Sequence, residues 1–159
     1  MYIICGLIVL GSIAVDQITK LIAINGLYMK PSIELIKNFF YLTYVENRGA
    51  GWGLLSGYRY TLILLPIIFL FFLIYFIFFK QKFTKLFYYA TSLVVAGAIG
   101  NLIDRVFRGY VVDFFNFYIF GYDFPVFNVA DCCIVVGVIA MAILILTNKY
   151  ELKPEDKSE

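Results

Sequence analysis

The 159-residue chain contains no histidine, and its few cysteines are badly placed for a metal or disulfide framework. Without histidine, a Ser–His–Asp or Cys–His nucleophile is excluded, and most zinc sites are excluded as well. Cys5, Cys132 and Cys133 all fall in apolar runs, where a cysteine is usually a small buried hydrophobic residue. We therefore expect no metal and no cofactor.

The chain is also poor in charge. Charged residues make up 15% of it, whereas soluble globular proteins contain about 25%, and the mean hydropathy is +0.87. The net charge of +2 forms no basic stripe, which excludes a nucleic-acid partner. Length and composition together indicate a single membrane-embedded domain.

Four segments approach the roughly 20 apolar residues that cross a bilayer, namely 2–24, 60–79, 86–103 and 129–147. The first lacks the basic start and small-residue cleavage site of a signal peptide, so it is expected to be retained. The predicted fold class is an α-helical membrane protein with four transmembrane helices. A single domain is expected over residues 1–148, followed by a charged cytoplasmic tail.

The third and second segments are expected to occupy different places in the bundle. The third is rich in small residues, which allow close helix packing, so it is predicted to be central. There, Gly97 and Gly100 are expected to leave room for the side chain of Asn101. The second segment is uniformly apolar and is predicted to face lipid.

Two long loops, 25–59 and 104–127, lie on one side of the predicted membrane, and both termini lie on the other. Aromatic and β-branched residues within 33–45 predict short strands. Three lysines in the short loop 80–85 favour cytoplasmic termini, although six basic residues fall on each side.

Glycine and proline punctuate the second of these loops. Gly109, Gly121 and Pro125 predict turns within it.

Asp113 and Asp131 are the residues most informative about function. A carboxylate beside a membrane span is costly unless it is paired, hydrated or protonated. Two carboxylates that face each other do not both ionise easily, so one can act as a base on water while its protonated partner polarises a carbonyl. This chemistry requires neither a metal nor a cofactor. Alternatively, Asn128 caps the fourth span and Asp131 simply complements the helix dipole.

Further polar residues from four chain segments map to the same membrane level as these acids. Asp16 and Lys20 are four residues apart on one helical face, which is expected to be a structural ion pair. Asp104 and Arg105 are expected to form interfacial ion pairs with the loops. The remaining members of this candidate site are Asn47, Gly49, Asn101 and Asn128.

Five ordered blocks of sequence resemble the successive motifs of lipoprotein signal peptidase, also called signal peptidase II. They are residues 16–20 (Asp-Gln-Ile-Thr-Lys), 47–50 (Asn-Arg-Gly-Ala), 97–105 (Gly-Ala-Ile-Gly-Asn-Leu-Ile-Asp-Arg), 111–114 (Val-Val-Asp-Phe) and 124–131 (Phe-Pro-Val-Phe-Asn-Val-Ala-Asp). The order and spacing agree over residues 1–148. The chain departs from the family pattern at Gly51, Ala96 and Asn116, none of which belongs to the expected acid pair.

This resemblance implies an aspartyl endopeptidase of the bacterial inner membrane. Such an enzyme cuts the signal peptide from a prolipoprotein, just before a cysteine that carries diacylglycerol. The resemblance also implies a four-helix bundle with a small extracytoplasmic β-cradle, and inhibition by the cyclic peptide antibiotic globomycin. Asp113 and Asp131 would be the catalytic pair, and Ala130 would join the supporting residues named above. Because one chain holds the whole site, a monomer in contact with membrane lipid is expected.

Two other functions remain open on the residues alone. In a small four-span transporter, a membrane acid such as Asp16 would exchange protons against a substrate. The 35-residue loop 25–59 argues against this. In a non-enzymatic assembly subunit, the acids would serve only as structural contacts.

Overall fold

The structure, a computed structural model, describes residues 1–50, 54–80 and 82–152. Gly51 and the tail residues 153–159 therefore lie outside the described residues. Four helices in this part of the chain are long and apolar enough to cross a membrane. They are α1 (Tyr2–Leu27), α2 (Arg59–Lys80), α3 (Lys85–Phe107) and α4 (Val129–Leu146).

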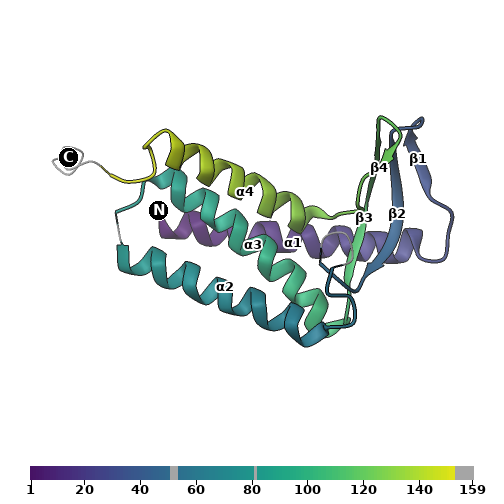
Figure 1. The fold of residues 1–159 in the computed structure, drawn as a ribbon, viewed down its shortest axis with the longest axis horizontal. Helices are drawn as coiled ribbons and strands as arrows, with labels where there is room; N and C mark the ends of the chain where they lie inside the picture. Colours follow the sequence, from purple (N-terminus) through teal and green to yellow (C-terminus); the bar gives the residue numbers. More distant parts are fainter. Residues whose placement is uncertain (51–53, 81, 153–159) are drawn as a thin grey trace.

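A four-stranded antiparallel sheet of order β1-β2-β3-β4 lies at one end of the helices. Its strands are β1 (Ile33–Ile36), β2 (Phe40–Asn47), β3 (Val111–Ile119) and β4 (Tyr122–Asp123). The start of α1, the end of α2, the start of α3 and the end of α4 lie at the opposite end (Figure 1). The strands expected within residues 33–45 and the placement of the two long loops are thereby confirmed.

The second long loop contains more regular structure than its turn signals predicted. Residues 111–115, whose apolar residues around Asp113 imply a strand or turn against an apolar surface, form the first part of strand β3, although Val-Val-Asp-Phe-Phe-Asn-Phe-Tyr-Ile does not alternate cleanly between apolar and polar residues. The expected turns are present at Gly109 and Gly121, whose φ angles are 87° and 81°, whereas Pro125 lies in a stretch without a turn. Both values lie in the left-handed region that glycine adopts without steric cost.

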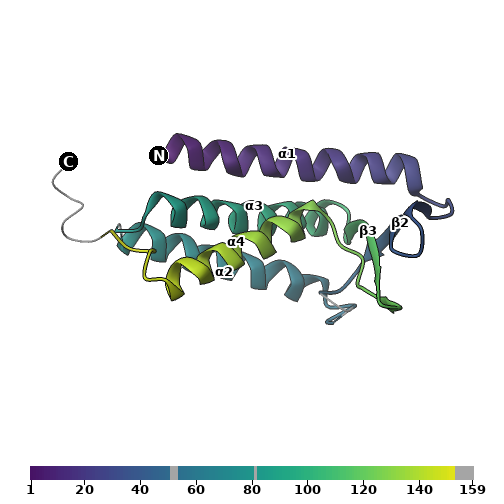
Figure 2. The ribbon, with the colours of Figure 1, turned by 90° about the horizontal axis from the view of Figure 1, so that it is seen from above.

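Helix α3 is the centre of the bundle, as its small residues predicted. In its most apolar stretch 56% of the residues are buried, against 11% for α2. Figure 2 shows α1 running along one side of the other three helices. Helix α2 is mostly exposed on the outside of the bundle, as a lipid-facing span would be, and that it faces lipid stays a prediction.

The glycines of α3 allow close contact, but with other groups than expected. A Cβ atom on Gly97 would lie 2.2 Å from the backbone oxygen of Ala130, and one on Gly100 would lie 2.7 Å from Asp16 Oδ2. The expectation that these glycines make room for Asn101 is therefore wrong. They face α4 and the buried carboxylate of α1, because both neighbours approach the backbone of α3 directly.

Two spans extend further toward the sheet than hydropathy predicted. Helix α1 continues to Leu27 rather than ending at residue 24, and α3 continues to Phe107 rather than ending at 103. Asp104, which lowers the hydropathy of the last turns of α3, is paired with Lys20 and Arg108, so it does not end the helix. Residue-level hydropathy cannot detect such pairing.

At the other end, the chain after α4 folds back onto the start of α3. Thr84 N donates to Tyr150 O at 2.8 Å, and Leu152 N donates to Lys82 O at 2.7 Å. The ring of Tyr150 contacts Phe83 and Phe87. The domain boundary after residue 148 stays a prediction.

Candidate active site

Strand β3 holds Asp113 on the face opposite to an apolar cluster. Val112 and Phe114 pack against Ala23 and Leu27 of α1. Because strand side chains alternate between faces, Asp113 between them points the other way. Only 1% of Asp113 is exposed, so the sheet fixes a carboxylate in a dehydrated position.

Both oxygens of Asp113 accept hydrogen bonds from asparagine side chains. Asn128 Nδ2 donates to Oδ1 at 2.6 Å, and Asn47 Nδ2 donates to Oδ2 at 2.9 Å. Burial, followed by the negative charge of Asp131, nevertheless raises the pKa of Asp113 to about 7. The carboxyl group can therefore keep a proton near neutral pH.

Asp131 lies in the first turn of α4 and is held by both of its oxygens. Its Oδ2 accepts from Asn128 N at 3.2 Å while Asn128 Oδ1 accepts from Asp131 N at 3.0 Å, which forms a capping box. Its Oδ1 accepts from Asn101 Nδ2 at 2.7 Å. The interpretation of Asn128 as the cap of α4 is therefore confirmed. Asp131 Oδ1 takes no part in the cap and is bonded to Asn101 instead.

Two asparagines connect the carboxylates. Asn128 Nδ2 lies 2.6 Å from Asp113 Oδ1 and 3.2 Å from Asn101 Oδ1. Asn101 in turn donates to Asp131 and accepts from Lys20 Nζ at 3.1 Å. A continuous chain of hydrogen bonds thus runs from β3 to α4 and α1.

Lys20 is fully buried between two carboxylates. Its Nζ lies 2.9 Å from Asp16 Oδ2 and 3.0 Å from Asp104 Oδ2. Asp104 also pairs with Arg108, the C-cap residue of α3. The expected Asp16–Lys20 ion pair is therefore present, inside the bundle.

The same two carboxylates also hold the backbone next to each candidate acid. Asp16 Oδ1 accepts from Ala130 N at 2.9 Å, and Asp104 Oδ2 accepts from Val112 N at 3.1 Å. Ala130 and Val112 directly precede Asp131 and Asp113. The ionic cluster therefore positions both chain segments that carry the acids.

The expected ion pairs of Asp104 and Arg105 with the loops are wrong for the described residues. Asp104 pairs with Lys20 and Arg108 because α3 continues past it and turns it toward α1. Arg105 Nη2 instead donates to Gly49 O at 3.1 Å, and Gly49 N donates to Asn47 Oδ1 at 2.9 Å. Arg105 thereby orients the loop that presents Asn47 to Asp113.

Asp113 and Asp131 line one cavity of about 520 Å³. Asn47, Asn101 and Arg105 form its polar part. The rest of the wall is mainly apolar and comes from residues 124–127 and from Val135 and Val136 of α4. The carboxyl groups therefore meet the polar end of a mostly hydrophobic chamber, a combination typical of a site for small or extended apolar ligands.

Two contributors to the site were missed by sequence reasoning. Gln17 donates to Asp16, Asp104 and the backbone oxygen of Gly100, and Arg108 donates to Gln17 and pairs with Asp104. Signals existed for both: Gln17 lies inside the block 16–20, and Arg108 follows Asp104 by four residues. Among the described residues, no group of three His, Cys, Asp or Glu side chains is arranged to hold a metal ion.

Comparison with known proteins identifies the family. Residues 8–147 match the family described as Signal peptidase (SPase) II, Peptidase A8. The chain belongs to the signal peptidase II family. It is therefore an aspartic peptidase and a lipoprotein signal peptidase, as the motif blocks predicted.

Similar proteins agree with this family membership along nearly the whole chain. A lipoprotein signal peptidase of Clostridium acetobutylicum is 48% identical over 146 residues, which are 88% of this chain and 92% of that protein. A bacterial membrane enzyme solved in meso at 2.3 Å is 39% identical, with a TM-score of 0.82 over 98% of this chain and 92% of its own. A second, solved in meso at 1.9 Å, is 41% identical, with a TM-score of 0.81 over 91% and 93%. This signal peptidase II is thus a multi-pass bacterial membrane enzyme.

Proposed function

We propose that Asp113 and Asp131 are the catalytic pair of this signal peptidase II. The substrate would be a diacylglyceryl-modified prolipoprotein, cleaved just N-terminal to its lipidated cysteine. The observation that carries this proposal is that both carboxylates line one cavity and are linked through Asn101 and Asn128.

In the proposed reaction, the pair shares one proton. The ionised carboxylate takes a proton from water, whose oxygen attacks the scissile carbonyl carbon, while the protonated partner donates its proton to the carbonyl oxygen. The resulting gem-diol is neutral. When it collapses, the C–N bond breaks, the gem-diol returns a proton to the pair, and the pair protonates the departing nitrogen. The products are a carboxyl group on the signal peptide and a free amine on the lipidated cysteine.

The shape of the cavity supports this substrate. Its apolar wall of residues 124–127, Val135 and Val136 would contact the hydrophobic signal segment and the diacylglyceryl group. Its polar end would receive the scissile peptide bond. Asn47 and Gly49 would border the bound chain from the loop side, where Arg105 supports them.

The buried ionic cluster would act as positioning machinery. Asp16 and Asp104 hold the backbone beside the two acids, and Lys20 lies between them. Lys20 also donates to Asn101, which holds Asp131. Through Asn101, Lys20 would fix one carboxylate orientation without touching substrate.

We further propose that both termini are cytoplasmic and that the site opens at the extracytoplasmic surface of the bacterial inner membrane. Lysines near the ends of α2 and α3 support this orientation. A monomer would suffice, because one chain contributes all the groups named here. Globomycin-type inhibitors would occupy the cavity that contains both acids.

The test is cleavage of a lipidated precursor by purified protein. Asp113→Asn and Asp131→Asn are each expected to lose cleavage while retaining fold. The matched control is Asp123→Asn, since Asp123 is exposed on β4 outside the cavity. Wild type is expected to cleave the diacylglyceryl form and to leave the unmodified precursor intact. Normal processing by either of the first two variants would contradict the assignment of the pair.

A further inference from the structure

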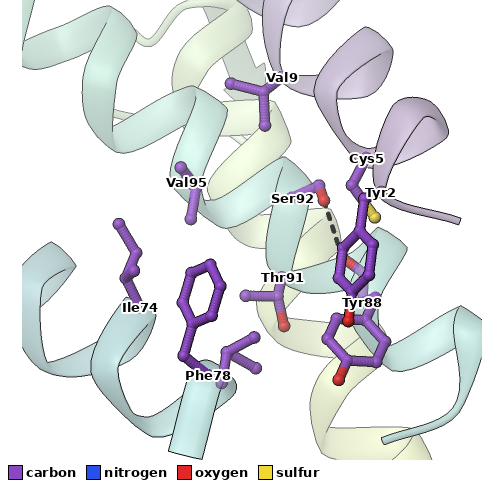
Figure 3. A pocket seen from close by; sticks show the side chains of 10 residues that line it. Tyr2, Cys5, Val9, Ile74, Phe78, Tyr88, Thr91, Ser92 and Val95 are labelled. Atoms are coloured by element: carbon purple, nitrogen blue, oxygen red, sulfur yellow. Dashed lines mark hydrogen bonds between the residues drawn. The ribbon is translucent and has the colours of Figure 1, made fainter. Parts of the chain in front are cut away.

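A second cavity, of about 360 Å³, lies between α1, α2 and α3, toward the end of the bundle at which α1 begins. Figure 3 shows side chains from α1 and α2 facing each other across α3. Val9 of α1, Ile74 and Phe78 of α2, and Val95 of α3 line it. This second cavity, called the groove from here on, shares no lining residue with the cavity that contains the two aspartates.

The hydroxyl groups of Ser92 and Thr91, which line the groove, are already hydrogen-bonded. Ser92 Oγ donates to Tyr88 O at 2.8 Å, and Thr91 Oγ1 donates to Phe87 O at 2.9 Å. Both bonds are made within α3, so neither hydroxyl donor needs a ligand. The surface offered to an occupant is therefore essentially hydrocarbon, and an apolar chain is the ligand that loses least on entering it.

One end of the groove carries positive charge. Lys85, Tyr88, Ser92 and Val95 follow one another at spacings of three and four residues, so they share one face of α3. Tyr88, Ser92 and Val95 line the groove, and exposed Lys85 lies one turn beyond them. Tyr2 meets Tyr88 edge-to-face at 6.3 Å, and amphipathic rings of this kind mark the headgroup level of a membrane.

Most of the other charged residues at this end of the groove are also positive. Lys82 before α3, Lys85 in its first turn and Lys149 after α4 are exposed lysines, against the single acid Glu151 among the described residues of these segments. Clustered lysines beside a span attract anionic lipid headgroups. A hydrocarbon groove that ends in positive charge matches the two parts of an anionic phospholipid.

We propose that this groove binds one acyl chain of an anionic phospholipid, with the headgroup beside Lys85. The medium around the four spans is lipid, so the ligand is present at high concentration wherever the protein is inserted. The lipid fills the space between α1 and α2 on the surface of α3 and connects these helices. This site does not depend on the assignment of the catalytic acids.

The experiment uses full-length protein in nanodiscs that contain a phosphatidylglycerol with a diazirine on its acyl chain. After irradiation, labelled peptides are mapped by mass spectrometry, with the matching phosphatidylcholine probe in parallel. Labelling by the anionic probe is expected to concentrate on the peptides that contain Val9 and Val95. Val9→Trp fills the groove and is expected to abolish this labelling. Leu10→Trp, on the exposed side of α1, is the matched control and is expected to retain the labelling.

The headgroup contact is tested with a variant that does not perturb packing. Lys85→Gln is expected to lower labelling by the anionic probe about fivefold and to leave the zwitterionic probe unchanged. Lys37→Gln, an exposed lysine near the sheet, is the control and is expected to have no effect. Labelling that is equal for both probes and insensitive to Lys85→Gln would overturn the proposal. Displacement of the probe by a signal peptide, or a chain-to-chain cross-link through the groove, would equally overturn it.

Discussion

Replacement of Asp113 by asparagine is expected to stabilise the protein at alkaline pH while it abolishes cleavage. The pKa of Asp113 is raised to about 7 by burial and by Asp131, whereas an aspartate in an unfolded chain titrates near about 3.9. The folded state therefore binds this proton more tightly than the unfolded state. Below about pH 4 both states are protonated and the site costs nothing.

The loss of wild-type stability caused by ionising the buried Asp113 grows as the pH rises from about 4 to about 7, and it is constant above that. Three pKa units at about 1.4 kcal/mol each make it about 4 kcal/mol at pH 8. Asparagine avoids this penalty, but it offers one oxygen where Asp113 offers two to Asn47 and Asn128. Loss of one such bond costs about 1–2 kcal/mol. The net stabilisation by Asp113→Asn is therefore about 2–3 kcal/mol at pH 8.

At pH 5 the same arithmetic leaves almost no difference. The ionisation of Asp113 costs the wild-type protein about 1–2 kcal/mol there, which the lost hydrogen bond offsets. The measurement is the free energy of unfolding by denaturing detergent, followed by circular dichroism at pH 5, 6, 7 and 8. Asp123→Asn serves as control and is expected to show no growing difference from wild type. A variant that is less stable than wild type at pH 8, or equally shifted at every pH, would refute the reasoning.

Three further outcomes are expected. Cleavage by wild type should fall as the pH rises through about 7, because the shared proton then leaves the pair; a rate that keeps rising to pH 9 in a folded enzyme would exclude a protonated partner. Lys20→Met should cost about 3–5 kcal/mol of stability, because it leaves two buried carboxylates without their common cation; equal unfolding midpoints for variant and wild type would contradict this. Gly97→Ala should destabilise by roughly 1–3 kcal/mol or more and slow cleavage, since its Cβ would meet the backbone of Ala130. Gly6→Ala, which meets nothing within 4 Å, should do neither.

The fold could be predicted from the sequence to the extent that it follows from hydropathy. All four spans were placed correctly, because each presents a long apolar run to lipid. The ends of α1 and α3 toward the sheet were placed too early. For α3 the reason is that Asp104 looks like a loop residue until its buried partners are known. The same limit applies to Gly100, whose missing side chain makes room for Asp16 from another helix.

The membership of the candidate site was easier to predict than its connections. Motif blocks named Asp16, Asn101 and Asn128 as neighbours of the acids, and the structure brings them together. Apart from the local pairs Asp16–Lys20 and Asn128–Asp131, the hydrogen-bond partners could not be derived, because they are far apart in sequence. The bond from Ala130 N to Asp16 Oδ1, for example, spans 114 positions. That pair exists only because α1 and α4 pack on the glycine face of α3, the face that carries Gly97 and Gly100.

The glycine face and the buried charges are physically dependent on each other. An ionised carboxylate at the end of a membrane span is stable only with partners at hydrogen-bonding distance. Asp16 Oδ1 accepts a hydrogen bond from Ala130 N beside Gly100. A Cβ atom on Gly100 would lie 2.7 Å from the other oxygen of Asp16, Oδ2. A larger residue there would separate the helices and remove the partner of a buried charge in the same step. Close packing is therefore a condition for charge at this depth, and the charge in turn fixes the start of α4, where Asp131 lies.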